Sequence, residues 1–230
     1  SFQVYVTQAF RNIMTDYVAL IEKYFLYILQ GAVITVELTV LALILSVVIG
    51  LTVTFTYMSH VRWLKSVAAV YIELVRATPA LLQLFIVYYG LTNIGIRFDA
   101  FTAAVLTLGF IGGAYSAEIF RAGIEAIDYG QVEASRSLGM TAIQAMKRII
   151  LPQAFVITLP PLTNFVIAMI KDTSLALTIS VPEIMYRSYD AATQSYRSLA
   201  VYMMAGVIYL AICIPLSRLA KRLERKGDAS

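Results

Sequence analysis

The chain has 230 residues, of which 60% are hydrophobic and only 14% are charged, and its mean hydropathy is +0.77. Soluble domains carry roughly 25% charged residues, so this composition excludes an ordinary water-soluble fold and indicates a membrane protein. The net charge of +4 needs no nucleic-acid partner, because basic loops beside anionic membrane lipid account for it. Cys213 is the only cysteine, which excludes a disulfide framework and a cysteine-based metal site.

Five nearly uncharged runs predict five membrane-spanning helices, since a helix needs about 20 apolar residues to cross the hydrocarbon. None of the runs alternates like a barrel strand, so the predicted fold is an all-α membrane protein. Residues 1–27 come first and predict an amphipathic segment at the membrane interface, without a cleavable signal peptide. The runs are residues 31–57, interrupted only by Glu37, then 77–96, 100–117, 149–170 and 198–217.

The connection between the first two runs contains a predicted break. Glu73 and Arg76 stand three residues apart, on one face of a helix, where they can form a surface ion pair. Pro79 follows and cannot donate a backbone N–H, so the helix should break where this segment turns into the second span.

The distribution of Lys and Arg predicts the orientation of the spans. With the N-terminus outside and the C-terminus inside, the inner segments hold 12 of the 18 basic residues. The C-terminal end contributes most of this bias. We expect one transmembrane domain over residues 28–225 and a short tail at 226–230.

A mixed-charge segment at about residues 125–152, here called the central loop, interrupts the apolar pattern. Asp128 and Thr141 are each followed three residues later by Gln, a capping-box pattern that marks two helix starts. Gly139 lies between them, where a residue in the left-handed conformation ends a helix at low cost. We therefore predict a helix at about 129–138, a sharp turn, and a second helix at about 142–151 that enters the membrane.

A signature spacing runs through the central loop, with Ser135 in the place of a second Ala: Glu133, Ala134, Gly139, Ile149, Leu151 and Pro152. This pattern resembles the cytoplasmic loop in the permease subunits of bacterial ABC importers. Residues 73–79 with Gln83, residues 114–124 and residues 171–176 resemble one branch of that family, the polar amino-acid uptake permeases. The resemblance covers about residues 28–225.

The resemblance implies a five-span fold of the type I ABC importer kind, in the bacterial inner membrane. It also implies several partners: a second permease subunit, identical or related, two cytosolic ATPase subunits, an extracytoplasmic solute-binding protein and a polar amino acid. The central loop would be a rigid lever seated in the ATPase. The implied ATPase-coupling residues are Glu133, Ala134, Ser135, Arg136, Gly139, Leu151 and Pro152.

Catalytic motifs are missing from the sequence. It contains neither a phosphate-binding loop nor the signatures of a metalloprotease or an esterase, so we expect no catalytic residue in this chain. ATP and Mg²⁺ would be bound by the partner ATPase, and this chain would bind no cofactor and no metal.

Polar groups within apolar spans are costly and are therefore candidates for a substrate pathway. Asp172 is the strongest candidate, because it follows a long uncharged run; it would either pair with Lys171 or receive the ammonium group of an amino acid. Prolines at 160–161 predict a break in the fourth span, and glycines at 112–113 favour close helix packing over room for substrate. The predicted pathway residues are Asp172, Ser174, Asn164, Tyr115, Ser116, Gln83 and Glu37.

A second hypothesis is a homo-oligomeric secondary transporter of amino acids, driven by an ion gradient that Asp172 and Glu37 would couple. The capped central loop favours the ABC permease, because a secondary transporter needs no cytosolic docking lever. A third hypothesis, a membrane scaffold, is disfavoured by the broken and polar helices.

Overall fold

The computed structural model describes residues 2–59 and 61–227 and, within them, contains helices and no strand, as the predicted all-α class requires. Short turns of π- or 3₁₀-helix follow three of the helices, at Ile86–Gly90, Leu91–Ile94, Met146–Ile150 and Thr173–Ile179. The α-helices in chain order are α1 (Phe2–Tyr57), α2 (Arg62–Ala77), α3 (Ala80–Phe85), α4 (Ala100–Glu125), α5 (Tyr129–Ser137), α6 (Ala142–Ala145), α7 (Leu151–Asp172), α8 (Ile184–Ser195) and α9 (Ser198–Gly227).

Four helical stretches are long and apolar enough to cross a membrane: Met14–Tyr57, Ala100–Glu125, Ala142–Ile179 and Ser198–Arg225. A fifth candidate is the pair Arg62–Ala77 and Ala80–Ile94, which meets the criteria jointly but is bent by 104°. The uncharged run at 77–96, predicted as the second span, therefore belongs to a bent candidate that begins earlier, at Arg62. The charges on α2 hide its contribution in the sequence, and the break expected at Pro79 divides this element in its middle.

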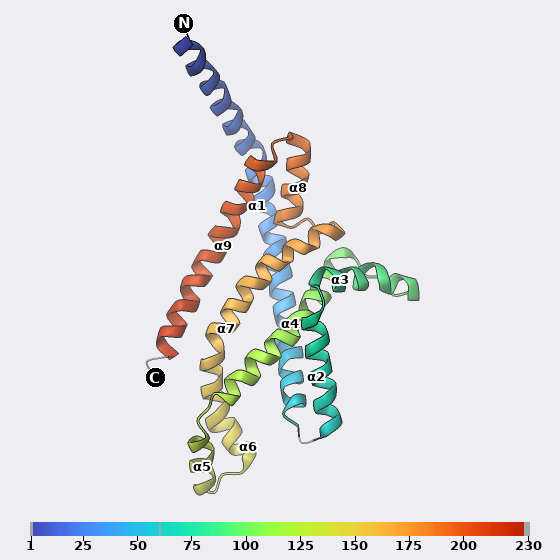
Figure 1. The fold of residues 1–230 in the computed structure, drawn as a ribbon, viewed down its shortest axis with the longest axis vertical. Coiled ribbons are helices and arrows are strands. Elements are labelled where there is room, and N and C mark those ends of the chain that lie inside the picture. Colours follow the sequence, from blue (N-terminus) through green and yellow to red (C-terminus); the bar gives the residue numbers. More distant parts are fainter. Residues whose placement is uncertain (1, 60, 228–230) are drawn as a thin grey trace.

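The first helix includes residues 2–27, which the sequence predicts as an interfacial segment. α1 runs without a break from Phe2 to Tyr57, so these residues form one helix with the first apolar run. The physical reason is that residues 2–30 contain neither Pro nor Gly. At about 1.5 Å per residue, a helix of this length far exceeds the roughly 30 Å of hydrocarbon, and Figure 1 shows it projecting beyond the other helices.

The predicted break in the fourth span is also wrong, because α7 continues through Pro160 and Pro161. The two prolines remove the N–H donors for the carbonyls of Val156 and Ile157. Both of those residues are exposed on the surface of α7, so no packed neighbour depends on the lost hydrogen bonds. Membrane helices tolerate such interruptions where neighbouring groups adjust.

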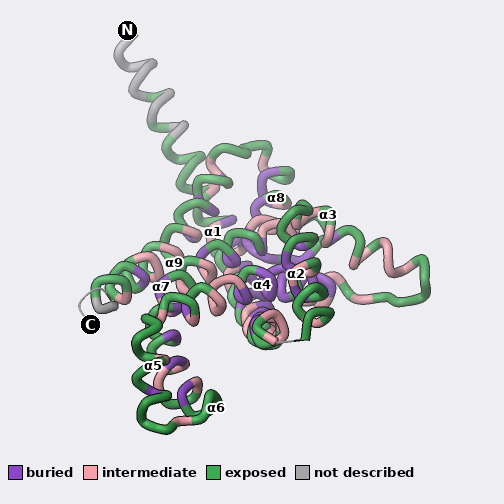
Figure 2. Tube along the Cα trace, turned by 60° about the horizontal axis from the view of Figure 1, so that its bottom comes forward, coloured by how far each residue is buried: buried purple, intermediate pink, exposed green. Residues whose placement is uncertain are grey.

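The core is densest where α4 crosses α1 (Figure 2). A Cβ atom on Gly112 would collide with the Ser46 hydroxyl of α1, and one on Gly113 would collide with Ile49. The Ser46 hydroxyl donates a 3.2 Å hydrogen bond to the Gly109 carbonyl across the same contact. The packing role predicted for glycines 112–113 is thus confirmed.

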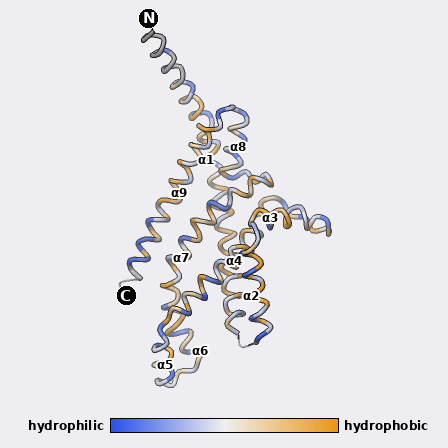
Figure 3. Tube along the Cα trace, viewed as in Figure 1, coloured by the Kyte–Doolittle hydropathy of each residue, from blue (hydrophilic) through white to orange (hydrophobic). Residues whose placement is uncertain are grey.

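The two ends of the molecule differ in character. The α5–α6 turn lies at the same end as the α1–α2 connection, and α9 runs toward that end from the end where the N-terminus projects (Figure 1). The last turns of α9 are hydrophilic in Figure 3, because Arg218, Lys221, Arg222 and Arg225 follow its apolar part. The first residues of the predicted tail still belong to α9, and residues 228–230 lie outside the described part.

Candidate functional site

The central loop folds as the local signals predict. α5 ends in a Schellman motif, in which the Met140 N–H donates to the Ser135 carbonyl and the Gly139 N–H to the Arg136 carbonyl, at 3.1 and 2.9 Å. Gly139 has a φ of +74°, the left-handed conformation that glycine adopts without strain. The helix–turn–helix arrangement is therefore confirmed by backbone geometry.

Both helix starts in the central loop are capped. The Asp128 carboxylate accepts a 2.6 Å hydrogen bond from the Gly130 N–H at the start of α5. Thr141 and Gln144 form a complete capping box at the start of α6, with the Thr141 N–H donating to the Gln144 amide oxygen at 2.9 Å. Each cap satisfies backbone donors that a helix start leaves open, so this short element keeps its shape without membrane burial.

The predicted coupling residues occupy different positions in the central loop. Glu133, Ala134, Arg136 and Gly139 are exposed on α5 and its turn, whereas Ser135 is fully buried between α5 and its neighbours. Ser135 therefore does not form part of the exposed surface of α5, and its hydroxyl donates to the Val132 carbonyl of the same helix at 2.7 Å. Leu151 and Pro152 lie at the start of α7, away from the turn. Sequence reasoning missed three strongly exposed apolar side chains here, which are Leu138 (76% exposed), Ile143 (68%) and Tyr129 (64%).

Two of the predicted pathway residues share a cavity. Asp172 and Tyr115 both line a space of about 220 Å³ between α4 and α7, here called the α4–α7 cavity, together with Ala80, Leu108, Ile111, Gly112, Phe165, Ala168 and Met169. The ring of Tyr115 stacks on Phe165 with 6.1 Å between centroids. Asp172 forms no ion pair with Lys171 in the described part of the chain, so its carboxylate is the one acidic group of a largely apolar cavity.

The other predicted pathway residues lie elsewhere. Asn164 donates toward Glu224 of α9 at 3.4 Å, and Ser116 is buried against Gly50 of α1. Glu37 is exposed on α1 and Ser174 follows α7, and neither is among the residues that line the α4–α7 cavity.

Gln83 stabilises the bend between α2 and α3. Its side-chain amide donates to the carbonyl of Val75 at 2.9 Å and to the hydroxyl and carbonyl of Thr78 at 2.8 and 3.2 Å. These acceptors lie at the end of α2, where Pro79 ends the helix. Gln83 therefore holds α3 against the end of α2 and supplies the donors that the break removes.

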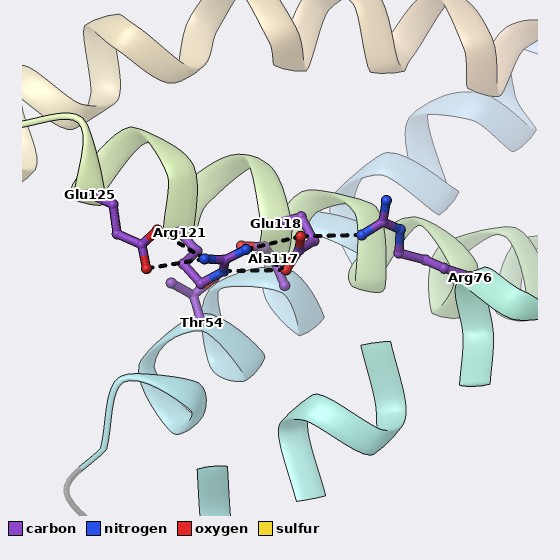
Figure 4. Close-up of polar contacts among 6 residues, drawn as sticks. All are labelled: Thr54, Arg76, Ala117, Glu118, Arg121 and Glu125. Atoms are coloured by element: carbon purple, nitrogen blue, oxygen red, sulfur yellow. Dashed lines mark hydrogen bonds and ion pairs between the residues drawn. The ribbon is translucent and has the colours of Figure 1, made fainter. Parts of the chain in front are cut away.

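A chain of charges connects α2 with α4 (Figure 4). The Glu118 carboxylate accepts from Arg76 at 3.2 Å and from Arg121 at 3.1 Å, and Arg121 also pairs with Glu125 at 2.9 Å. The ion pair expected between Glu73 and Arg76 is thus replaced by one between helices. The sequence does indicate the part of this network on α4, since three charged residues spaced three and four positions apart lie on one face of that helix.

A second cavity opens beside this charge network, here called the α2–α4 cavity. It measures about 500 Å³ and is lined by Glu73, Arg76 and Glu118, by the rings of Tyr57 and Tyr115, and by Ala69, Ile72 and Ala77. Tyr115 lines both cavities, and the Arg76 guanidinium lies 5.5 Å from the centre of its ring. The two cavities are therefore neighbours with one aromatic wall in common.

Glu183 is a fully buried carboxylate that sequence reasoning missed. Its oxygens accept from the N–H groups of Met185 and Tyr186 at 2.9 and 2.7 Å, which caps α8, and from the Tyr209 hydroxyl of α9 at 3.2 Å. Burial raises the pKa of Glu183 from its ordinary value of 4.5 to about 6, against the lowering effect of these three donors.

Within residues 2–59 and 61–227, no group of three or more His, Cys, Asp or Glu side chains could hold a metal ion.

Comparison with known proteins gives consistent matches over most of the chain. Residues 42–227 match the family described as the binding-protein-dependent transport system inner membrane component. Two relatives from Bacillus subtilis (strain 168) are the L-cystine transport system permease protein TcyB and the arginine transport system permease protein ArtQ. TcyB is 38% identical over 91% of this chain and 90% of its own length; ArtQ is 37% identical over 87% and 92%.

Among solved structures, the fold resembles the chain described as "Crystal structure of an amino acid ABC transporter with histidines". The TM-score is 0.85 at 38% sequence identity, and the match covers 90% of this chain and 96% of that one.

Proposed function

Since this chain belongs to the binding-protein-dependent inner membrane component family and is a permease component of an amino-acid ABC importer, we propose that its central loop couples it to a separate ATPase. The family is one of permease subunits, which are not themselves catalytic. ATP and Mg²⁺ would act in the partner, and this chain would bind no cofactor.

The observation that carries this proposal is the construction of the central loop. Two capped helix starts and a Schellman turn fix the local shape of the central loop, so a force applied to α5 would be passed through α6 to α7. Leu138, Ile143 and Tyr129 provide an exposed apolar surface, and Glu133 and Arg136 flank it with charge. A surface of this composition suits a protein partner.

We further propose the arrangement of the assembly. Five spans, counting the bent α2–α3 pair as one, would place the N-terminus outside and the C-terminus and the central loop inside. This orientation agrees with the excess of basic residues near the loop end of the molecule. A second permease subunit, two ATPase subunits and an extracytoplasmic solute-binding protein would complete the importer.

The α4–α7 cavity is the proposed entry site for the solute. A polar amino acid carries an ammonium group, and Asp172 is the acidic side chain that lines this cavity. The relatives named above transport cystine and arginine, which share the α-ammonium and α-carboxylate groups. A secondary transporter coupled through Asp172 and Glu37 has no support, because Glu37 does not line this cavity.

The test is to purify the chain with the ATPase and the solute-binding protein of its importer. The complex would be placed in lipid nanodiscs, and ATP hydrolysis would be measured with each amino acid in turn. We expect one chemical group of amino acids to stimulate hydrolysis. A complex that no amino acid stimulates, or a chain that binds no ATPase, would contradict the proposal.

A further inference from the structure

The α2–α4 cavity holds ionisable side chains of α2 and α4, which both belong to candidate membrane spans. Glu73, Arg76 and Glu118 lie at its walls, and its volume of about 500 Å³ is within the 300–1,000 Å³ typical of small-molecule sites. Ionisable side chains within spans are costly unless they are paired or serve a solute. The ion pairs account for Glu118, but not for Glu73 or for the remaining donors of Arg76.

Arg76 has hydrogen-bonding capacity to spare. A guanidinium has five N–H donors, and within the described residues Arg76 uses one of them, on Glu118. Its side chain is 45% exposed, so the other donors are accessible from the cavity. A carboxylate is the group that such a planar donor set binds best.

Glu118 would still have a charged partner if Arg76 bound another carboxylate. Arg121 donates to both oxygens of Glu118 at 3.1 Å and keeps its charge compensated (Figure 4). The exchange of one carboxylate for another on Arg76 therefore avoids the penalty of an uncompensated charge in a partly buried site.

Glu73 supplies the complementary charge. It lies one helical turn from Arg76 on α2, lines the same cavity, and has no hydrogen bond or ion pair among the described residues. Side chains three apart on a helix have Cβ atoms about 5–6 Å apart. Two side chains this close can both reach one amino acid, Glu73 at its ammonium group and Arg76 at its carboxylate.

We propose that the α2–α4 cavity is a second amino-acid site, in which Arg76 binds the carboxylate and Glu73 the ammonium of the solute. The inference rests on the proposed function. Tyr115 forms the wall between this site and the α4–α7 cavity, so the solute passes from Asp172 to Arg76 as it moves toward the central loop. Asp172 would thus bind the ammonium group of the solute in the first cavity, and Arg76 would bind its carboxylate in the second.

Cysteine protection tests the site directly and does not depend on transport. Ala77, which lines the cavity, is replaced by Cys in a Cys213→Ser background, and labelling by a methanethiosulfonate reagent is timed in the intact nanodisc complex. The probe is the amino acid that gives the largest ATPase stimulation, compared with its decarboxylated amine. At about ten times the dissociation constant, the amino acid should slow labelling about tenfold, because only the empty fraction reacts.

The controls separate this site from its neighbour. Val67→Cys is exposed on α2 but does not line the cavity, so its labelling should be unaffected. Arg76→Met should abolish protection at Ala77→Cys, and Arg76→Lys should weaken it. Co-purification with the ATPase verifies that each variant is assembled.

Equal protection by the amine, or protection that survives Arg76→Met, would overturn the proposal. An amino acid that stimulates the ATPase without protecting Ala77→Cys would also overturn it, while leaving the proposed function intact. A complex that no amino acid stimulates is the separate failure described above.

Discussion

Gly31 of α1 lies directly against the backbone of Glu183, so that a Cβ atom at Gly31 would stand 2.8 Å from the Glu183 carbonyl carbon. Thr35, one turn further along α1, accepts a 3.4 Å hydrogen bond from the Ile184 N–H. α8 is therefore anchored to α1 through backbone contacts that leave no room for a methyl group.

Gly31→Ala should destabilise the protein. The clash is with backbone atoms, which cannot rotate away, and overpacking of this kind typically costs about 1–3 kcal/mol. For a chain of this size, each kcal/mol lowers Tm by about 2–4 °C, which thermal unfolding in nanodiscs resolves. Gly206→Ala is the matched control, because a Cβ on Gly206 of α9 meets nothing within 4 Å. That variant should be neutral or stabilised, and equal losses in both would argue against the contact.

The buried Glu183 predicts a loss of stability as pH rises. In the unfolded chain the carboxyl ionises near its ordinary pKa of 4.5, whereas in the folded chain its pKa is about 6. Between these values the folded state binds more protons, so stability is greatest below pH 4.5 and falls as pH rises through 6. The full difference corresponds to about 2 kcal/mol, or roughly 4–8 °C in Tm.

Glu183→Gln removes the titrating group while keeping the size of the side chain. The Tm of the wild type should therefore fall relative to the Tm of this variant as the pH rises from 5 to 7. A difference that stays constant over this range would mean that Glu183 does not titrate there in the folded protein.

Asp172→Asn should alter which amino acids are taken up, or how well, because it removes the acidic group of the α4–α7 cavity. ATPase binding should be unchanged, since the central loop is distant along α7. Uptake into proteoliposomes across a panel of amino acids provides the measurement. Asn164→Ala alters a polar group on the same helix outside the cavity and should leave the panel unchanged. If both variants behave like wild type, Asp172 has a structural role only.

Local signals made the central loop predictable. Capping boxes and a left-handed glycine depend on residues three to six positions apart, and all of them lie within the segment from Asp128 to Gln144. The all-α class followed equally directly from the length of the apolar runs. These features need no knowledge of distant contacts.

Long-range contacts account for most of what sequence reasoning missed. Nothing around Glu183 shows that it is buried, because its environment is created by α1 and by Tyr209 of α9. Gln83 was predicted as a pathway residue because it is a polar side chain in an apolar run. Its actual role depends on a 104° bend, an angle that composition cannot reveal. Of the seven predicted pathway residues, only Asp172 and Tyr115 line the α4–α7 cavity. The other five do not, because a polar residue in a span can equally face another helix.

Gln83→Leu should loosen the bend between α2 and α3. The variant leaves the carbonyls of Val75 and Thr78 without their donor, and an unsatisfied polar group costs about 1–3 kcal/mol when water cannot replace it. Spin labels at Val70→Cys and Ile94→Cys, in a Cys213→Ser background, would report the angle between the two halves as a distance distribution. We expect a broader distribution and a lower Tm.

Gln153 provides the comparison for this variant. Its amide donates to the Ile149 carbonyl from an exposed position on α7, where water can take its place. Gln153→Leu should therefore change stability by less than about 0.5 kcal/mol. An unchanged distance distribution in Gln83→Leu would show that Pro79 alone sets the bend.

Gly139→Val should leave the protein in the membrane but abolish transport and weaken binding to the ATPase. Valine at a φ of +74° is strained by at least about 1–2 kcal/mol, and relief of that strain requires the Schellman turn to open, which reorients α5. Glu133→Lys should have the same functional effect through charge reversal on the exposed face of α5. Transport in proteoliposomes and co-purification of the ATPase are the two measurements.

Gly95→Val separates strain from position. Gly95 has a φ of +87°, and a Cβ atom on either Gly95 or Gly139 would meet no other atom within 4 Å, so the backbone penalty is similar at both sites. Gly95 follows Leu91–Ile94 in the connection to α4, at the opposite end of α4 from the central loop. ATPase binding should survive in Gly95→Val and fail in Gly139→Val. If both variants kept the ATPase and full transport, the turn at Gly139 would not transmit force, and the lever role of the central loop would have to be abandoned.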